Sequence, residues 1–171
     1  YPHSASAMLY FSDLEEACKA VVAMKKGPVA GAELLDKKSL SAVNDPTGEG
    51  LTAVLTETKA DTPEELQKNI NEILEILKPF KLFKPAYFTD KPEEYSQYWK
   101  IRSGIFPSVG GTRPLGTTVL IEDVAFHIED LPKATVELQQ LLQDNGYTDA
   151  CIYGHALEGN YHFIISQSFD S

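Results

Sequence analysis

Apolar residues recur every three or four positions in several segments of the chain, and this spacing predicts amphipathic helices. The clearest one has Thr62 as its N-cap, Pro63 in its first position and Glu65 completing a capping box. It is expected to end at Pro79, because proline cannot continue a helix. The other helices are expected after a capping box that opens at Ser12, around residues 37–43, over residues 92–103, and between Asp130 and Gly146.

Short segments rich in β-branched and aromatic residues lie between the predicted helices and indicate strands. They cover residues 5–11, 28–35, 51–58, 82–88, 117–126, 148–155 and 161–168. Helices alternate with strands, but the last two strands are joined by a short loop and form a hairpin. We therefore expect an α+β fold of the ferredoxin-like kind, with an antiparallel sheet and helices packed on one face. The β-α-β-β order in both halves predicts two related units within a single domain of residues 1–171.

Composition narrows the class of protein. The formal net charge of -10 at pH 7 disfavours nucleic acid as a partner, since phosphate binding requires a basic surface. No apolar run reaches about 18 residues, the length of a membrane span, and no secretory signal opens the chain. The cysteines, Cys18 and Cys151, are far apart and fit small buried core residues. We expect a cytoplasmic protein, either free or peripheral at the inner membrane.

The segment with the sharpest chemistry has the sequence GHALEGNYH over residues 154–162. If the last strands form a hairpin around residues 156–161, His155 and His162 lie opposite each other, with Cβ atoms about 5 Å apart. Two imidazoles at that distance could share a divalent metal or flank a substrate proton. Asn160 would share their face. A pair of hairpin histidines without a ligand is an equally supported alternative.

A metal needs more than two ligands, and Glu158 is the candidate for a third. His3 is expected in an unstructured N-terminus, and His127 as a solvated residue at a strand end. The acidic pair Glu122-Asp123 lies in an otherwise apolar strand, where a structural salt bridge is the default expectation.

A second candidate feature is Arg102, at the end of an aromatic-rich helix that opens into a loop rich in glycine and proline. A guanidinium in this place could bind a carboxylate bidentately, whereas an ordinary surface arginine is the alternative. Arg113, in the same loop, is a weaker candidate. The chain has no G-x-G-x-x-G, P-loop, G-x-S-x-G or H-E-x-x-H motif, so it carries no recognisable nucleotide-binding site of its own.

Taken together, these segments resemble the C-terminal domain of FAD-linked oxidases, the family that includes glycolate oxidase, D-lactate dehydrogenase and D-2-hydroxyglutarate dehydrogenase. Residues 99–107 match the family's helix-end arginine, residues 122–125 its D-V-x-V-P strand, and residues 154–162 its G-H-x-x-D-G-N-x-H signature. Residues 32–36 also look like the family's E-L-L-D. The likeness covers nearly the whole chain, and the histidine motif is its specific part.

The resemblance implies a ferredoxin-like cap over the isoalloxazine and the oxidation of a D-2-hydroxy acid, with hydride transfer to FAD. His155 and His162 would match the family's divalent-metal ligands, commonly zinc, and both are expected to be catalytic. The metal would hold the substrate's hydroxyl and carboxylate and acidify the hydroxyl. Arg102 would match the arginine that binds the substrate carboxylate, and Asn160 would help to hold the substrate.

The chain also departs from the family pattern, which puts its substrate in question. Glu158 stands where the family motif has Asp, His127 where its strand ends in Pro, and Ile121 where some members have a substrate-binding Lys. The family's further metal-site glutamate lies in an E-H-G segment downstream of the histidines, which this chain does not contain.

The start at Tyr-Pro-His without Met, together with the absent E-H-G segment and FAD-binding domain, predicts a piece of a longer enzyme that is inactive alone. The variants at residues 121–124 and 154–160 look closest to large bacterial fusions with an iron–sulfur domain. Expected partners are therefore the protein's own FAD-binding domain, a small 2-hydroxy acid, and an iron–sulfur domain or other electron-transfer partner. The alternative is a stand-alone ferredoxin-like module that binds a small molecule, or an interaction domain, without catalysis.

Overall fold

The computed structural model describes residues 2–36, 51–104, 117–125, 127–146, 151–158 and 160–168, with residues 117–125, 151, 158 and 160–168 described by their backbone. Its centre is a six-stranded sheet in the order β1-β3-β2-β5-β6-β4, in which every neighbouring pair is antiparallel. The strands are β1 (His3–Phe11), β2 (Gly31–Leu35), β3 (Thr52–Ala60), β4 (Thr117–Ala125), β5 (Cys151–His155) and β6 (Asn160–Ser168). The predicted α+β class with an antiparallel sheet is confirmed.

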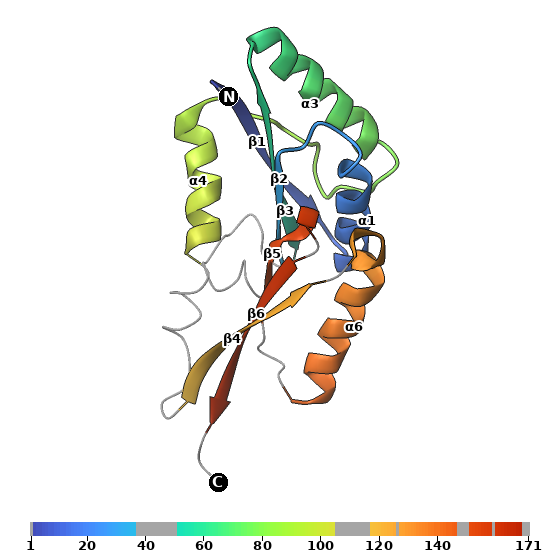
Figure 1. Ribbon diagram of the computed structural model, residues 1–171, viewed down its shortest axis with the longest axis vertical. Helices are drawn as coiled ribbons and strands as arrows, with labels where there is room; N and C mark the ends of the chain where they lie inside the picture. The colour runs from blue at the N-terminus through green and yellow to red at the C-terminus, as the bar shows by residue number, and fades with distance from the viewer. Residues whose placement is uncertain are drawn as a thin grey trace.

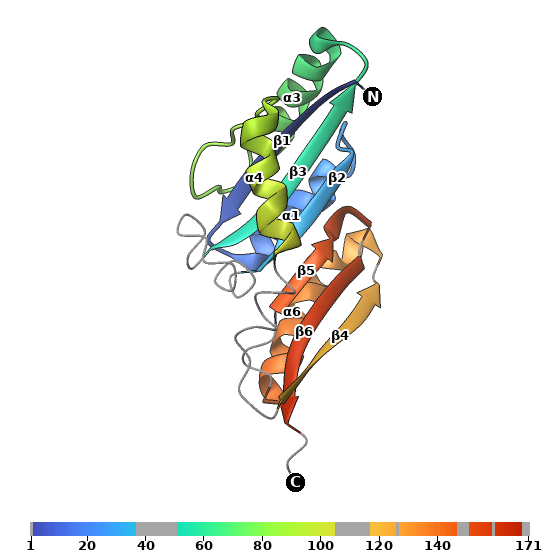
Figure 2. The same cartoon turned by 90° about the vertical axis from the view of Figure 1, so that its left-hand side faces the viewer.

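Helices lie on both faces of this sheet (Figure 1). The helices α1 (Leu14–Met24), α3 (Pro63–Leu77) and α6 (Leu131–Asp144) share one face, as predicted. The helix α4 (Pro92–Ser103) lies on the other face, over the half of the sheet formed by β1, β3 and β2 (Figure 2). The sequence did not indicate this placement, because α4 has no buried apolar stripe from which its face could be assigned.

The chain contains two β-α-β-β units, β1-α1-β2-β3 and β4-α6-β5-β6, with α3 and α4 between them in the sequence, which confirms the expectation of two related units. In each unit the first strand pairs with the third, and the third with the second. The two units join through their second strands, β2 and β5, to give one continuous sheet. The junction therefore pairs the C-terminal halves of the two edge strands, residues 33–35 and 153–155.

Local sequence signals explain where the helices begin. The side chain of Thr62 accepts a hydrogen bond from the backbone N–H of Glu65 (3.1 Å), as the capping box of α3 predicts. For α1 the predicted cap at Ser12 is wrong by one residue, because the Asp13 carboxylate accepts from Glu15 N (3.3 Å). Asp130 occupies the N-cap of α6 but makes no side-chain cap bond, because a short 3-10 turn (η1, Ile128–Asp130) already leads into the helix.

The expected strand over residues 82–88 is wrong. This segment runs beside β1 and contacts it at isolated points. The Phe83 N–H donates to the Tyr10 carbonyl (2.8 Å), and Ser6 and Thr89 form a bridge. Pro85 cannot donate to a ladder, so a continuous strand does not form. Strand β2 begins at Gly31 rather than at Pro28, and the predicted helix around residues 37–43 lies outside the described residues.

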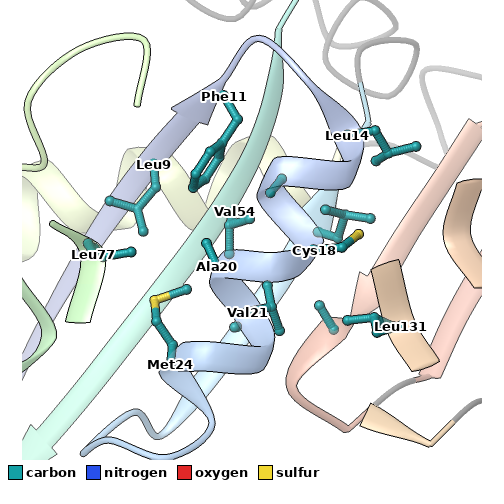
Figure 3. Close-up of a cluster of buried hydrophobic side chains, with 14 of the residues drawn as sticks. Leu9, Phe11, Leu14, Cys18, Ala20, Val21, Met24, Val54, Leu77 and Leu131 are labelled. Atoms are coloured by element: carbon teal, nitrogen blue, oxygen red, sulfur yellow. The ribbon is translucent and has the colours of Figure 1, made fainter. Parts of the chain in front are cut away.

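The main core lies between the sheet and the helices α1, α3 and α6. Figure 3 shows Leu9, Phe11 and Val54 of the sheet against Cys18 and Val21 of α1. Each of these five side chains is almost fully buried, which fits the prediction for Cys18. No helix in the described parts of the chain is long and apolar enough to cross a membrane.

The junction between the two units is reinforced by Asp36, just after β2. Its backbone N–H donates to the Ile152 carbonyl (3.1 Å), and its carboxylate accepts from the Ile152 N–H (2.9 Å). Asp36 is 3% exposed, so both bonds are shielded from water. The Asp36 side chain thus extends the ladder between β2 and β5 by one residue beyond the end of β2.

We predict that Asp36→Ala lowers the free energy of unfolding by about 1–3 kcal/mol, because it leaves the buried N–H of Ile152 without this acceptor. Urea denaturation measures the difference. Asp90→Ala, which removes an exposed carboxylate, is the control and is expected to stay within about 0.5 kcal/mol of the unchanged protein. Equal midpoints for the two variants would contradict the role given to Asp36.

Candidate functional site

Polar residues gather on the sheet face that carries α4, at the junction of the two units. Glu33 of β2 pairs with His155 of β5, and His155 pairs with Asn160 of β6, so these positions form one row across three strands. The adjacent row holds Leu35, Tyr153 and His162. Residues two apart on a strand share a face, so both rows lie on the same side of the sheet. That side is the α4 side, because Leu35 and Tyr153 belong to the cluster that packs against α4.

The expected direct opposition of His155 and His162 is wrong. His155 lies opposite Asn160, and His162 lies opposite Tyr153. The reason is the connection: the 3-10 turn η2 (Ala156–Glu158) lets β6 begin already at Asn160, so the hairpin closes in fewer residues than expected. An offset of two residues keeps both histidine positions on one face, and diagonal neighbours are about 7–8 Å apart. Asn160 shares this face, as predicted.

Gly154 explains part of the motif that precedes His155. Its φ of 144° lies in a region that residues with a side chain rarely adopt. The glycine therefore permits a local backbone conformation in β5 between Tyr153 and His155, the two strand residues that contribute to the site.

Glu33 is the centre of the site in the described structure. Its Oε1 accepts from Nδ1 of His155 (2.6 Å), and its Oε2 accepts from Nε of Arg102 (3.2 Å). The Glu33 side chain is 9% exposed, whereas those of Arg102 and His155 are 21% and 51% exposed. A shielded carboxylate thus links β2, β5 and the end of α4.

The sequence reasoning did not single out Glu33 as a site residue, although a signal was present. In β2 the run Gly-Ala-Glu-Leu-Leu places one acidic residue among apolar ones, in a strand whose other positions are mostly buried. A carboxylate is costly to bury unless it is paired, so its position already implied cationic or hydrogen-bonding partners.

Arg102 is fixed from two sides. Its Nε donates to Glu33, and its guanidinium lies 4.7 Å from the centre of the Tyr153 ring, a cation–π contact. Among the described residues, no acceptor bonds to Nη1 or Nη2 of Arg102. Arg102 and Glu33 line an open pocket of about 580 Å³ together with residues of α4: Tyr95, Ser96, Trp99, Lys100 and Ser103. This arrangement can present two guanidinium donors to an anion.

The helix α4 holds Arg102 over the sheet. Its first turn carries Glu93 and Glu94 and its last turn carries Lys100 and Arg102, an order that complements the helix dipole. Trp99 donates from Nε1 to the Ser6 hydroxyl (3.3 Å) and packs, with Tyr98 and Ile101, on the apolar part of the same sheet face. The C-terminal end of α4 therefore lies next to β2.

The electrostatics of α4 keep Tyr98 protonated. Partial burial raises the pKa of the Tyr98 hydroxyl, and the nearby negative charge of Glu94 raises it further. The pKa of Glu94 is lowered, chiefly by the hydrogen bond with Thr89 and also by Tyr87 and Lys91. Tyr98 therefore acts in this interface as a neutral aromatic residue.

The expectations for the remaining candidate residues had different outcomes. His3 is part of β1 and pairs with Ala60, so the expectation of an unstructured N-terminus is wrong. His127 is exposed and precedes η1, as expected. Asp123 pairs with His162 and so shares the face of the site. Arg113 and the side chain of Glu158 lie outside the described residues. Within the described part of the chain, no group of three His, Cys, Asp or Glu residues could hold a metal ion.

Comparisons with known proteins agree with this architecture. Residues 2–171 match the family model described as "FAD linked oxidases, C-terminal domain". The structure is similar to one of alkyldihydroxyacetonephosphate synthase, with a TM-score of 0.69 and 11% identity over 99% of this chain and 37% of that one. It is also similar to p-cresol methylhydroxylase with substrate bound, with a TM-score of 0.61 and 14% identity over 99% of this chain and 39% of that one.

At such identities these structural similarities show the fold. The chain spans less than two-fifths of the length of either neighbour. Among curated proteins, none matches the chain in sequence.

We predict that Tyr153→Leu lowers the free energy of unfolding by about 0.5–2 kcal/mol more than Tyr153→Phe, because phenylalanine keeps a ring beneath the Arg102 guanidinium and leucine does not. The Phe variant also controls for the loss of the hydroxyl. Urea denaturation at low salt measures the difference. Identical unfolding of the two variants would show that the ring does not support Arg102.

Proposed function

The chain belongs to the C-terminal domain family of FAD-linked oxidases, and we propose from this membership that it is the substrate-side domain of an FAD-dependent D-2-hydroxy-acid dehydrogenase of the lactate, glycolate or 2-hydroxyglutarate type. The names of the structural neighbours denote other reactions, so the fold does not select a substrate. The observation that supports a hydroxy acid is the pairing of Arg102 and His155 through Glu33 beside an open pocket.

In this proposal the substrate carboxylate binds Nη1 and Nη2 of Arg102. A guanidinium is suited to this task because its planar donors match a carboxylate and remain charged. The Tyr153 ring and the Glu33 carboxylate hold the guanidinium, which limits the conformational freedom that binding would otherwise remove. Asn160, in the same row as His155, supplies a further polar group from β6.

His155 is proposed to handle the substrate hydroxyl. Its Nδ1 is bonded to Glu33, so Nε2 is the ring nitrogen that would receive the hydroxyl proton or a metal ion. When bound, FAD accepts the hydride that leaves C2 of the hydroxy acid, which becomes a 2-oxo acid. The chain has no G-x-G-x-x-G motif, so we propose that the flavin is held mainly by another domain of the full-length protein.

A divalent metal, zinc in our proposal, would use His155 and His162 as ligands. The two positions share a face, and the Glu33 contact at Nδ1 is typical of a histidine that binds a metal through its other nitrogen. Two histidines are fewer than zinc requires, so further ligands would come from outside the described residues. Electrons would leave the flavin to an iron–sulfur domain or a separate electron-transfer partner.

We predict that the full-length flavoprotein oxidises a D-2-hydroxy acid with an artificial electron acceptor, and that Arg102→Lys raises KM by about 10–100-fold. Lysine cannot form the paired guanidinium contact, and a lost hydrogen bond to a charged group costs about 1.5–3 kcal/mol. Lys91→Gln, at the exposed start of α4, is the control and should leave KM unchanged. An unchanged KM in the Arg102 variant would exclude the carboxylate-binding role.

For the metal we predict that His162→Ala removes the bound ion and lowers turnover at least about 100-fold, since a Lewis acid contributes several kcal/mol to such a reaction. Metal content is measured by elemental analysis of the purified full-length protein. His127→Gln removes an exposed histidine and should retain both metal and activity. Turnover at the original rate in the His162 variant would contradict the metal-ligand role.

A further inference from the structure

We propose that Glu33 is the positioning residue of this site, which fixes the ring of His155 and aims the guanidinium of Arg102 into the pocket. The inference rests on the function proposed above and makes Glu33 responsible for the geometry of both partners. Each carboxylate oxygen of Glu33 serves a different partner, Oε1 for His155 and Oε2 for Arg102. The partners come from separate elements, β5 and α4, so Glu33 sets their relative geometry.

The burial of Glu33 makes this role effective. Its side chain is 9% exposed, and its strand neighbours Ala32 and Leu34 are buried in the main core on the other face. Hydrogen bonds in such surroundings are stronger than in water, and an unpaired carboxylate there would be costly. Glu33 is also anchored by the ladders to β3 and β5, where it pairs with Leu55 and His155. The carboxylate therefore has little freedom to move away from its partners.

For His155 the contact determines which ring nitrogen carries the proton. A carboxylate accepts hydrogen bonds, so the imidazole donates from Nδ1 and the lone pair is on Nε2. The His155 side chain is 51% exposed, so the loss of Glu33 would remove a main constraint on the orientation and tautomer of the ring. Glu33 thus prepares Nε2 for a proton or a metal ion before a ligand arrives.

For Arg102 the contact determines which donors point to the pocket. Glu33 occupies Nε, Tyr153 lies against the guanidinium, and no described residue accepts from Nη1 or Nη2. A carboxylate that enters the pocket would therefore meet two donors in a fixed plane. The negative charge of Glu33 is compensated by Arg102 itself, which reduces its repulsion of an anionic substrate.

The alternative is that Glu33 only fastens α4 to the sheet. The two roles separate in the full-length flavoprotein when three variants are compared, Glu33→Gln, Glu33→Asp and Glu57→Gln. Glu57 is the matched control: it lies on the same face, on the neighbouring strand β3, and pairs with Lys59 (3.4 Å) away from the site. For each variant we would measure KM, and kcat normalised to the amount of bound flavin. The Kd of oxalate, a non-oxidisable carboxylate, is measured from flavin absorbance.

We expect Glu33→Gln to raise both KM and the oxalate Kd by about 10–100-fold and to lower kcat, the size typical of losing a residue that orients a ligand. Glu33→Asp keeps the charge but is too short to reach both partners, so it should give an intermediate effect and serve if the Gln variant does not fold. Glu57→Gln should match the unchanged enzyme in all three quantities.

If Glu33 had a purely structural role, its variants would have a lower melting temperature, but the flavin-loaded protein would keep its KM and its oxalate Kd. That result would overturn the inference. If the unchanged enzyme oxidises no 2-hydroxy acid but Glu33→Gln still weakens oxalate binding, the proposed substrate is wrong and the positioning role stands. If the unchanged enzyme turns over a hydroxy acid and both Glu33 variants equal it, the proposed function stands and the positioning role is wrong.

Discussion

The antiparallel pairing of β2 with β5 organises both the sheet and the candidate site. It is the strand contact that joins the two β-α-β-β units into one sheet, and Asp36 extends it by bonding to Ile152. Because sheet register fixes which residues face each other, the same pairing places Glu33 opposite His155. A shift of the β2 register by one residue would turn Glu33 towards the apolar core and separate it from His155 and Arg102. The pairing of β2 with β5 thus joins the two units and also brings together two residues of the candidate site.

The two faces of the sheet differ in polarity. The face under α1, α3 and α6 is mostly apolar, although the buried Thr56 hydroxyl donates to the Met24 sulfur of α1, and it supplies the burial that stabilises the domain. The α4 face has an apolar part that holds the helix and, beside it, a polar part at the junction. The polar part is costly to bury, and the ion pair of Glu33 with Arg102 and its contact with Nδ1 of His155 offset that cost. The proposed site therefore lies where the apolar part of this face ends.

The sequence predicted the helices and strands better than it predicted strand register and contacts between distant residues. The α3 helix was predictable in full because Thr62, Pro63 and Glu65 are local signals with a direct physical effect. The register of the last hairpin was not predictable, because it depends on the 3-10 turn after His155. The residue pattern of the histidine motif does not indicate this turn. The histidine motif and Arg102 were found from residue type and spacing. The acidic residue in the apolar strand β2 indicated that Glu33 has partners, but not which ones, because Arg102 and His155 lie 69 and 122 positions away in the chain.

We propose that a hydroxy acid binds in the pocket beside Glu33, Arg102 and His155 and faces the flavin. A crystal structure of the full-length flavoprotein with oxalate would test this placement. We expect an oxalate carboxylate within hydrogen-bond distance of Nη1 and Nη2 of Arg102, with the second end of the ligand towards His155 and the flavin ring on the α4 side of the sheet. Oxalate bound elsewhere, with the flavin away from this face, would contradict it.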